Sequence, residues 1–294
     1  MQKFKDCHPV VNFTYFVAVL GFSMVFMHPA LIAISLLSGF SYSVLLGGRN
    51  AVKTSVFMLP LVFGIAALNP IFNHEGMTIL AYLPSGNPLT MESVVYGISE
   101  GVMLMCILCH FSCFNEIMTS DKLMCLFGKI IPSLSLIFSM ELRFVPRFKT
   151  QLREVKNAQH FIGRDLSKGG MLRRAKNGIK ILSIMLTWCL ENGIDTADSM
   201  KSRGFGLHGR TSYSNYRWSR RDIGMLLYIL ILSAYVMLGG CMKVLRFNYF
   251  PVVKGTELSS YGITVIVAYA MLFLCPIIIE IRGIVRWEKL KSKI

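Results

Sequence analysis

Acidic residues are scarce in this sequence. Its 294 residues include 16 Asp and Glu against 31 Lys and Arg, which gives a formal net charge of +15. In a soluble chain such an excess would suggest a nucleic-acid partner. However, no Lys or Arg occurs between residues 54 and 121. The positive charge is therefore segregated from long apolar runs, which is the pattern of a protein that crosses a membrane.

Sequence signatures of enzymes and of secreted proteins are also absent. The chain has no Gly-x4-Gly-Lys-Ser/Thr phosphate-binding loop, no metalloprotease spacing and no nucleophile with an accompanying base. Its eight cysteines show no spacing typical of a disulfide framework. We therefore expect a protein that is neither an ATPase nor any other enzyme and that needs no cofactor.

Apolar residues make up 53% of the chain, which is more than a soluble domain of this size needs to fill its core. Six stretches with few or no charges are long enough to cross the hydrocarbon core of a membrane as helices. They lie at residues 10–27, 30–47, 54–72, 93–115, 223–242 and 259–281. The sequence therefore predicts an all-α integral membrane protein with about six transmembrane helices and a long cytoplasmic helical region between the fourth and fifth.

The basic residues predict the orientation, because loops rich in Lys and Arg stay in the cytoplasm. Residues 122–221 carry 19 basic and 6 acidic residues, and further basic residues precede the first span and follow the last. Both termini and the central region are therefore predicted to be cytoplasmic, and the loop at 73–92 is predicted to be external. The loop at 243–257 would also be external, yet it holds three basic residues and does not fit the rule.

Three parts follow from this pattern. Residues 1–118 form an N-terminal membrane part with about four spans. Residues 119–221 form the basic cytoplasmic region, and residues 222–294 form a C-terminal membrane part with about two spans and a basic tail.

Glu100 is the clearest acidic residue inside a predicted span. A charge at that depth is costly unless it is paired or hydrated. Glu100 could line a substrate path or contact a partner subunit. It could also be protonated, or turn towards a neighbouring helix, and the sequence leaves these possibilities open.

Cys106, Cys109 and Cys113 form a stripe along one predicted helix, with His110 between them. This spacing could present soft ligands to a metal ion. Small polarisable residues, however, commonly pack helix against helix in membranes. We therefore interpret the stripe as a packing surface and predict no metal site.

The basic central region is predicted to be a series of helices. The expected ranges are 121–130, 133–163, 171–191 and 194–203. Pro146 should kink or break the second of them, and Gly204 should close the last. The second helix changes from apolar to basic along the chain, and the third changes from basic to apolar. Antiparallel packing would therefore bring their apolar ends together and their basic ends together.

Three short strings in this region are distinctive. They are Leu-Arg-Phe-Val-Pro at 142–146, Ala-Gln at 158–159, and Ala-Asp-Ser-Met-Lys-Ser-Arg-Gly-Phe-Gly at 197–206, which is followed by Gly-Arg-Thr-Ser-Tyr at 209–213. Together they resemble the motifs of the transmembrane T components of energy-coupling factor (ECF) transporters, which include the cobalt-transport CbiQ proteins. The order of elements resembles that family along nearly the whole chain, whereas the motifs match only between residues 119 and 213.

The resemblance implies a non-catalytic scaffold in a prokaryotic cell membrane. Its partners would be two ABC-type ATPases, a small substrate-binding membrane protein (the S component) and membrane lipid, but no nucleic acid. The transporter would take up a vitamin or a transition metal. In this family two Ala-Arg-Gly motifs, at the tips of cytoplasmic coupling helices, each dock into a groove on one ATPase.

The second docking motif is present as Ser202-Arg203-Gly204, but the first is degenerate. The register set by Ala158-Gln159 puts Phe161-Ile162-Gly163 where Ala-Arg-Gly belongs, and Arg164 comes one place too late. Either Arg164 substitutes through a local shift, or one ATPase contact is apolar. The residues expected to support the two tips are Arg143, Pro146, Ala158, Gln159, Asp198, Met200 and Gly206.

Two other classes of protein are compatible with parts of the sequence. A membrane-embedded lipid enzyme could use His110 and Glu100, and it should turn over its substrate without partners. A membrane-anchored binder of anionic lipid or nucleic acid could use the basic region, and its binding should fall steeply with salt. The basic residues are interleaved with apolar helical patterns and few aromatics are placed for base stacking, which favours a role facing the membrane and a partner.

Overall fold

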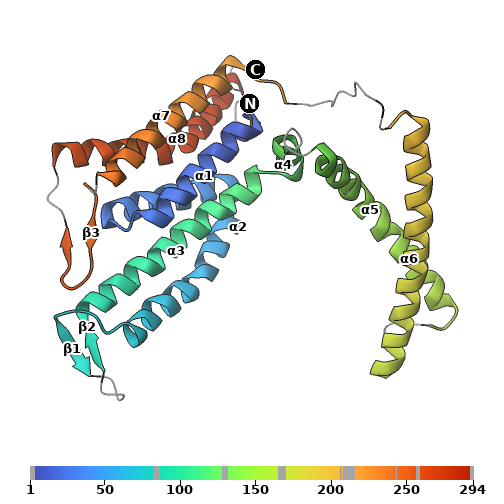
Figure 1. Cartoon of the computed structure of the whole chain (residues 1–294), viewed down its shortest axis with the longest axis horizontal. Coiled ribbons are helices and arrows are strands. Elements are labelled where there is room, and N and C mark those ends of the chain that lie inside the picture. Colours follow the sequence, from blue (N-terminus) through green and yellow to red (C-terminus); the bar gives the residue numbers. More distant parts are fainter. Residues whose placement is uncertain are drawn as a thin grey trace. The chain divides into compact units, whose positions relative to one another are not determined.

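In the computed structural model the chain is built mainly of helices (Figure 1). The residues described are 4–82, 87–127, 132–164, 170–205, 207, 216–242, 244–255 and 259–291. The helices fall into two compact units. The first unit comprises residues 1–123 and 216–294, and the second unit comprises residues 124–215.

The first unit is a helical bundle with two short antiparallel hairpins. Its elements are η1 (Phe4–Asp6), α1 (Pro9–Val25), α2 (Pro29–Phe72), β1 (Ile79–Tyr82), β2 (Pro88–Thr90), α3 (Met91–Ile117), α7 (Arg220–Cys241), β3 (Phe247–Asn248), β4 (Lys254–Gly255) and α8 (Ser260–Lys291). Pro9 and Pro29 occupy the first positions of their helices, where the missing amide hydrogen costs nothing. The imidazoles of His8 and His28 cap these two helices by accepting a backbone hydrogen bond.

Among the described residues, four helices are long and apolar enough to cross a membrane, namely α2, α3, α7 and α8. Helix α1 is apolar as well, but it has 17 residues. Large apolar side chains on the long helices remain exposed, for example Phe57 at 85% and Phe72 at 79%. Such side chains fit a surface that faces lipid. The predicted all-α integral membrane fold is confirmed, and the number of spans stays a prediction.

The second and third predicted spans lie on one element, α2, which is interrupted at Gly48. This residue has φ 55° and ψ −132°, and it divides the 44-residue helix into two arms. Side chains other than glycine rarely adopt a positive φ. The chain therefore turns between the two apolar stretches at a single glycine rather than through a loop.

We predict that Gly48→Ala destabilises the first unit. A β-carbon at this position would meet no atom within 4 Å, so the cost comes from the backbone alone and should be about 1–3 kcal/mol. Gly64→Ala is the matched control, because Gly64 is helical on the same element and its neighbourhood is also open. Thermal unfolding of the purified protein should show a lower Tm for the first variant and an unchanged or higher Tm for the second. Equal effects of the two changes would contradict this assignment of strain.

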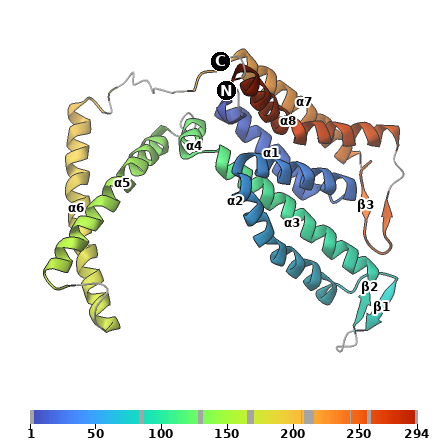
Figure 2. The same ribbon diagram turned by 180° about the vertical axis from the view of Figure 1, so that it is seen from behind.

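Helices α2 and α3 run side by side in both views (Figure 1 and Figure 2). Two glycines on α3 permit their close approach. A β-carbon on Gly97 would lie 2.8 Å from the carbonyl oxygen of Ala66, and one on Gly101 would lie 2.9 Å from that of Val62. Small residues four apart on a helix are a common way to bring membrane helices together.

Aromatic side chains join the loops at one end of the first unit. The Tyr249 hydroxyl donates to the carbonyl oxygen of Met27 at 2.6 Å, and its ring lies 5.4 Å from that of Tyr96. Phe247 contacts His28, with ring centroids 5.7 Å apart. The segment after α7 therefore lies at the same end as the turn between α1 and α2 and the start of α3.

Charged groups meet at the opposite ends of these helices. The buried ammonium group of Lys122 donates to the carbonyl oxygen of Lys5, and burial lowers the pKa of Lys122. The Phe4 amide donates to the Glu280 carboxylate at 3.3 Å. The Arg221 guanidinium donates to the Cys7 thiol at 3.0 Å. These contacts bind the N-terminal segment to the helix ends around it.

The second unit consists mainly of two helices, α5 (Pro132–Phe161) and α6 (Met171–Ser202), which follow the short helix α4 (Ser120–Phe127). Of the predicted kink or break at Pro146, the break is wrong, because α5 continues through this residue and Thr150 Oγ1 donates to its carbonyl oxygen. A kink stays a prediction. The two helices predicted at 171–191 and 194–203 form the single helix α6. The Asn192 side chain bonds to the carbonyl oxygen of Trp188 one turn earlier, and Gly193 costs only about 1 kcal/mol inside a helix.

Helices α5 and α6 cross one another (Figure 1 and Figure 2). The ring of Trp188 on α6 packs against Phe144 on α5, with centroids 5.7 Å apart. The Arg147 guanidinium lies over the same indole ring, also at 5.7 Å. This aromatic and cation–π contact fixes the level at which the two helices meet.

Candidate functional site

The C-terminal end of α5 is closed by Gly163, which has φ 80°. Its amide donates to the carbonyl oxygen of His160 at 3.0 Å, and the amide of Arg164 donates to that of Gln159 at 2.9 Å. This pair of hydrogen bonds is the Schellman motif, in which the residue after the helix adopts a left-handed conformation. Gly163 is therefore required by the backbone at the tip of α5.

Helix α6 ends in the same way at Gly204, which has φ 79°. The Gly204 amide donates to the carbonyl oxygen of Lys201 at 3.0 Å, and the Phe205 amide donates to that of Met200 at 3.0 Å. A β-carbon on Gly204 would also lie 3.1 Å from the Leu207 side chain. Both the conformation and the space at this position therefore favour glycine.

The two caps define which residues are equivalent. When Gly163 is matched to Gly204, Ile162 takes the position of Arg203, and Arg164 takes the position of Phe205. The backbone shows no local shift that would bring Arg164 into the place of Arg203. The geometry therefore agrees with the alternative in which the first tip presents an apolar residue.

Both tips expose their side chains. Ile162 is 66% exposed and the neighbouring Phe161 is 87% exposed, while Ser202 and Arg203 are exposed at the other tip. Large exposed apolar residues at a helix end mark a surface suited to a partner. One tip thus combines an aliphatic and an aromatic side chain, and the other presents a guanidinium beside a hydroxyl.

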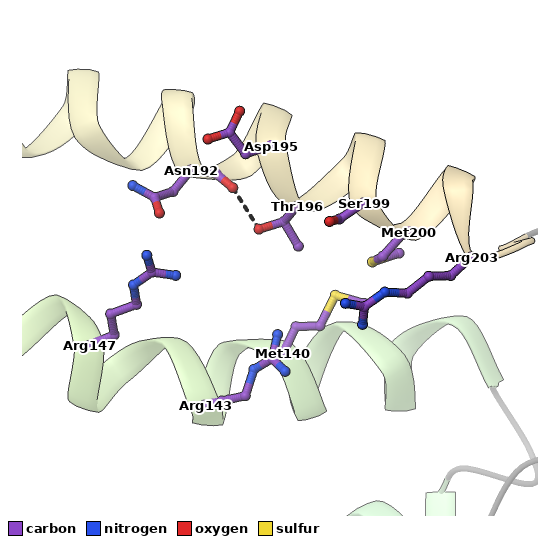
Figure 3. Close-up of a pocket in the computed structure, with 9 residues that line it drawn as sticks. All are labelled: Met140, Arg143, Arg147, Asn192, Asp195, Thr196, Ser199, Met200 and Arg203. Atoms are coloured by element: carbon purple, nitrogen blue, oxygen red, sulfur yellow. Dashed lines mark hydrogen bonds between the residues drawn. The ribbon is translucent and has the colours of Figure 1, made fainter.

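The two helices run antiparallel past one another (Figure 3). Their C-terminal ends therefore point in opposite directions from the Phe144–Trp188 contact. At 1.5 Å per helical residue, the tips lie up to roughly 50 Å apart. The second unit is thus a crossed pair of helices with one exposed cap at each end.

The residues predicted to support the tips have different surroundings. Arg143 and Met200 line one cleft together with Arg203 (Figure 3). The backbone carbonyls of Ala158 and Gln159 accept hydrogen bonds from the α5 cap, whereas Pro146 and Asp198 are exposed. Gly206 lies outside the described residues. The structure places Arg143 and Met200 beside Arg203 but does not bring Ala158 or Gln159 there.

Sequence reasoning missed Arg147 and Asn192, which line the same cleft. Arg147 lies one helical turn after Arg143 on α5, and side chains four residues apart share a helix face. Arg147 was therefore detectable in principle. Asn192 was assigned to a break between helices, so its place on the face of α6 could not be foreseen.

Glu100 turns towards a neighbouring helix, which is one of the possibilities that the sequence left open. Its carboxylate accepts a hydrogen bond of 2.6 Å from the Asn69 amide on α2. Gly97, about one turn before Glu100, and Gly101, the residue directly after it, allow α2 to come this close. This bond satisfies Glu100 within the helix pair.

The cysteine stripe on α3 faces α2. The thiol of Cys106 donates to the carbonyl oxygen of Ile32 at 3.5 Å, and that of Cys113 to Gly39 at 3.9 Å. His110 bonds to Ser35, and a β-carbon on Gly39 would lie 3.1 Å from its ring. Within the described ranges, no group of three or more His, Cys, Asp or Glu side chains could hold a metal ion. The observed contacts are those of a packing surface.

Comparison with known proteins gives matches of two kinds. Residues 7–213 match the model of a protein family described as CbiQ, cobalt transport protein. The chain is also similar to energy-coupling factor transporter transmembrane proteins called EcfT. The EcfT of Lactobacillus helveticus is 35% identical over 109 residues, which are 37% of this chain and 39% of the relative.

Two further relatives carry the same name. The protein of Lactococcus lactis is 32% identical over 109 residues, covering 37% of this chain and 41% of its own length. The protein of Listeria innocua is 26% identical over 197 residues, covering 60% of this chain and 74% of its own length. In the first two relatives the match therefore spans about two fifths of their length.

Proposed function

Because the chain belongs to the CbiQ family of cobalt transport proteins, we propose that it is the transmembrane T component of an energy-coupling factor importer. In this role it couples two ABC-type ATPases to a separate S component that binds a vitamin or a transition metal. The chain performs no chemistry of its own. It transmits the movement of the ATPases to the S component.

The observation that carries this proposal is the pair of matched caps. Two antiparallel helices end in the same backbone conformation, and each cap exposes side chains at one end of the crossed pair. One partner can therefore bind at each end. When ATP draws the two partners together, the force acts on both tips at once and turns the helices about their crossing. The similarity to proteins named EcfT supports the same conclusion.

The proposed orientation places both termini and the second unit in the cytoplasm of a prokaryotic cell. The charged end of the first unit, around Lys122 and Arg221, would then face the cytoplasm. The hairpins and the aromatic contacts of Tyr249 would face outwards.

Gentle purification of the tagged full-length chain tests the proposed function. We expect two nucleotide-binding subunits and one small apolar membrane protein to copurify in defined proportions, as identified by mass spectrometry. An unrelated membrane protein with the same tag and expression level is the control. If these partners are absent under several mild detergents, the proposal is wrong.

A further inference from the structure

Two connections of the chain join the second unit to the first. The chain leaves the first unit after Leu123, within α4, and returns to it at Tyr216, just before α7. A displacement of the second unit can pass along the backbone only if the residues at these two connections are held firmly. The contacts made next to each connection therefore decide whether the membrane helices move with the second unit.

The first connection is held by Lys122, the residue before Leu123. Its side chain is buried, and its ammonium group donates to the carbonyl oxygen of Lys5. The fully buried Asn12 provides a second acceptor. When its amide nitrogen donates to the Phe4 carbonyl oxygen at 3.1 Å, its amide oxygen accepts from Lys122 Nζ at 2.7 Å. A buried ammonium group is costly without such acceptors, so these bonds fix α4 to the N-terminal segment.

The second connection is held by the same N-terminal segment. The indole ring of Trp218 stacks on the imidazole of His8, with ring centroids 4.0 Å apart and planes inclined by 19°. The Arg221 guanidinium donates to the Cys7 thiol at 3.0 Å. Between these two contacts, Ser219 caps α7 in a capping box. The start of α7 is therefore fixed to residues 7 and 8.

The N-terminal segment also contacts the membrane helices. Phe4 is fully buried, and its amide donates to the Glu280 carboxylate of α8 at 3.3 Å. Its ring lies 5.2 Å from that of Tyr15 on α1 and 6.4 Å from that of Tyr42 on α2. Packed side chains and hydrogen bonds of this kind can carry coupling between distant parts of a protein. One short segment thus contacts both connections and three membrane helices.

We propose that residues Phe4–His8, which we call the N-terminal clasp, are the positioning element that transmits movement of the second unit to α1, α2 and α8. This role rests on the proposed function, because the ATPases supply the movement. Since both connections bind one clasp, loosening either of them loosens the other to the same degree. Two local contacts without a shared clasp would instead loosen independently.

Hydrogen–deuterium exchange of the purified full-length chain in detergent tests the shared clasp without any partner. Trp218→Ala removes the stacking on His8 at the second connection. We expect it to raise amide exchange about fivefold around residue 218, and also at residues 4–8 and 119–123, which belong to the clasp and the first connection. Lys122→Met should in return raise exchange at residues 216–222.

Trp287→Ala is the matched control, because Trp287 is another exposed tryptophan of the first unit, at 52% against 44% for Trp218. It should leave exchange at both connections as in the wild type. An increase confined to residues 216–222 in Trp218→Ala would overturn the clasp, because the two connections would then be held independently. If Lys122→Met does not fold, the two tryptophan variants still decide, since neither removes a fully buried side chain.

The complex that copurifies with the tagged chain tests the role in coupling. Exchange is measured with and without Mg-ATP and orthovanadate, which trap the ATPases in a closed state. In the wild type, trapping should change exchange in α5, α6, α1 and α8. In Trp218→Ala the change in α5 and α6 should remain, while the change in α1 and α8 should fall about fivefold.

Two failures of this experiment have different meanings. Bound ATPases with the same change in α1 and α8 in the wild type and in Trp218→Ala would overturn the coupling role of the clasp and leave the proposed function intact. A wild-type chain that copurifies with no ATPase would overturn the proposed function and the coupling role together.

Discussion

Replacing Arg203 with glutamate is expected to abolish uptake and to remove one ATPase contact while membrane insertion stays intact. Arg203 is the cap residue of α6 and is exposed. Its guanidinium makes no ion pair within the described ranges, so the fold does not depend on its charge. A partner's groove that accepts the guanidinium would instead meet a carboxylate. Losing one partner of a buried charged contact typically costs about 2–5 kcal/mol, so binding at this tip should weaken by roughly thirtyfold or more.

The measurement is the amount of ATPase that copurifies with the tagged chain, together with substrate uptake by cells that depend on the transporter. Arg153→Glu is the control, because it makes the same change of charge at an exposed site on α5 away from both tips. Arg203→Lys should fall between these variants, since lysine keeps the charge but not the fork of donors. If transport survives Arg203→Glu, Arg203 does not dock the ATPase.

The second large effect is expected at Ile162. Its position in the α5 cap equals that of Arg203 in the α6 cap, so Ile162 should enter the groove of the other ATPase. Ile162→Asp would bury a carboxylate with no partner, at a cost of at least about 2 kcal/mol. This corresponds to roughly thirtyfold weaker binding at that tip. Arg164→Ala should have a small effect, because Arg164 follows the cap.

Binding measurements with each ATPase distinguish the contributions of the two tips. Each ATPase is titrated against the purified chain, and its affinity is compared between the Ile162 and Arg164 variants. Ile162→Val is the conservative control and should bind nearly as the wild type does. Loss of binding with Arg164→Ala alone, with Ile162→Asp tolerated, would mean that the motif shifts when the partner binds.

Much of the helical pattern could be predicted from local sequence. The end of α6 was expected at Gly204, because glycine after a helix readily adopts a left-handed conformation, and the end of α5 was expected at residue 163. The register that makes Ile162 equivalent to Arg203 also followed from sequence, and the two caps have matching geometry. These predictions succeeded because caps depend on a few neighbouring residues.

Other features depended on forces that local sequence does not specify. Pro146 and Gly193 suggested interruptions, yet both helices are continuous. The free-energy costs of placing Pro146 and Gly193 inside a helix are small enough for the packing of α5 against α6 to outweigh them. The cleft was not foreseen, since Arg143, Arg147 and Arg203 line one cleft only through the crossing of α5 and α6. Periodicity within one helix says nothing about that crossing.

The unlike caps also imply an order of assembly. An ATPase groove shaped for an aliphatic side chain would leave the Arg203 guanidinium without a partner. A groove lined with carboxylates would leave Ile162 in contact with water. The ionic contact at Arg203 should form faster, because opposite charges attract partners from a distance. The first ATPase would then arrive at the α6 tip and hold the second close to the α5 tip, where the apolar contact of Ile162 and Phe161 completes the complex. Raising the salt concentration should therefore slow the first step and leave the second almost unchanged.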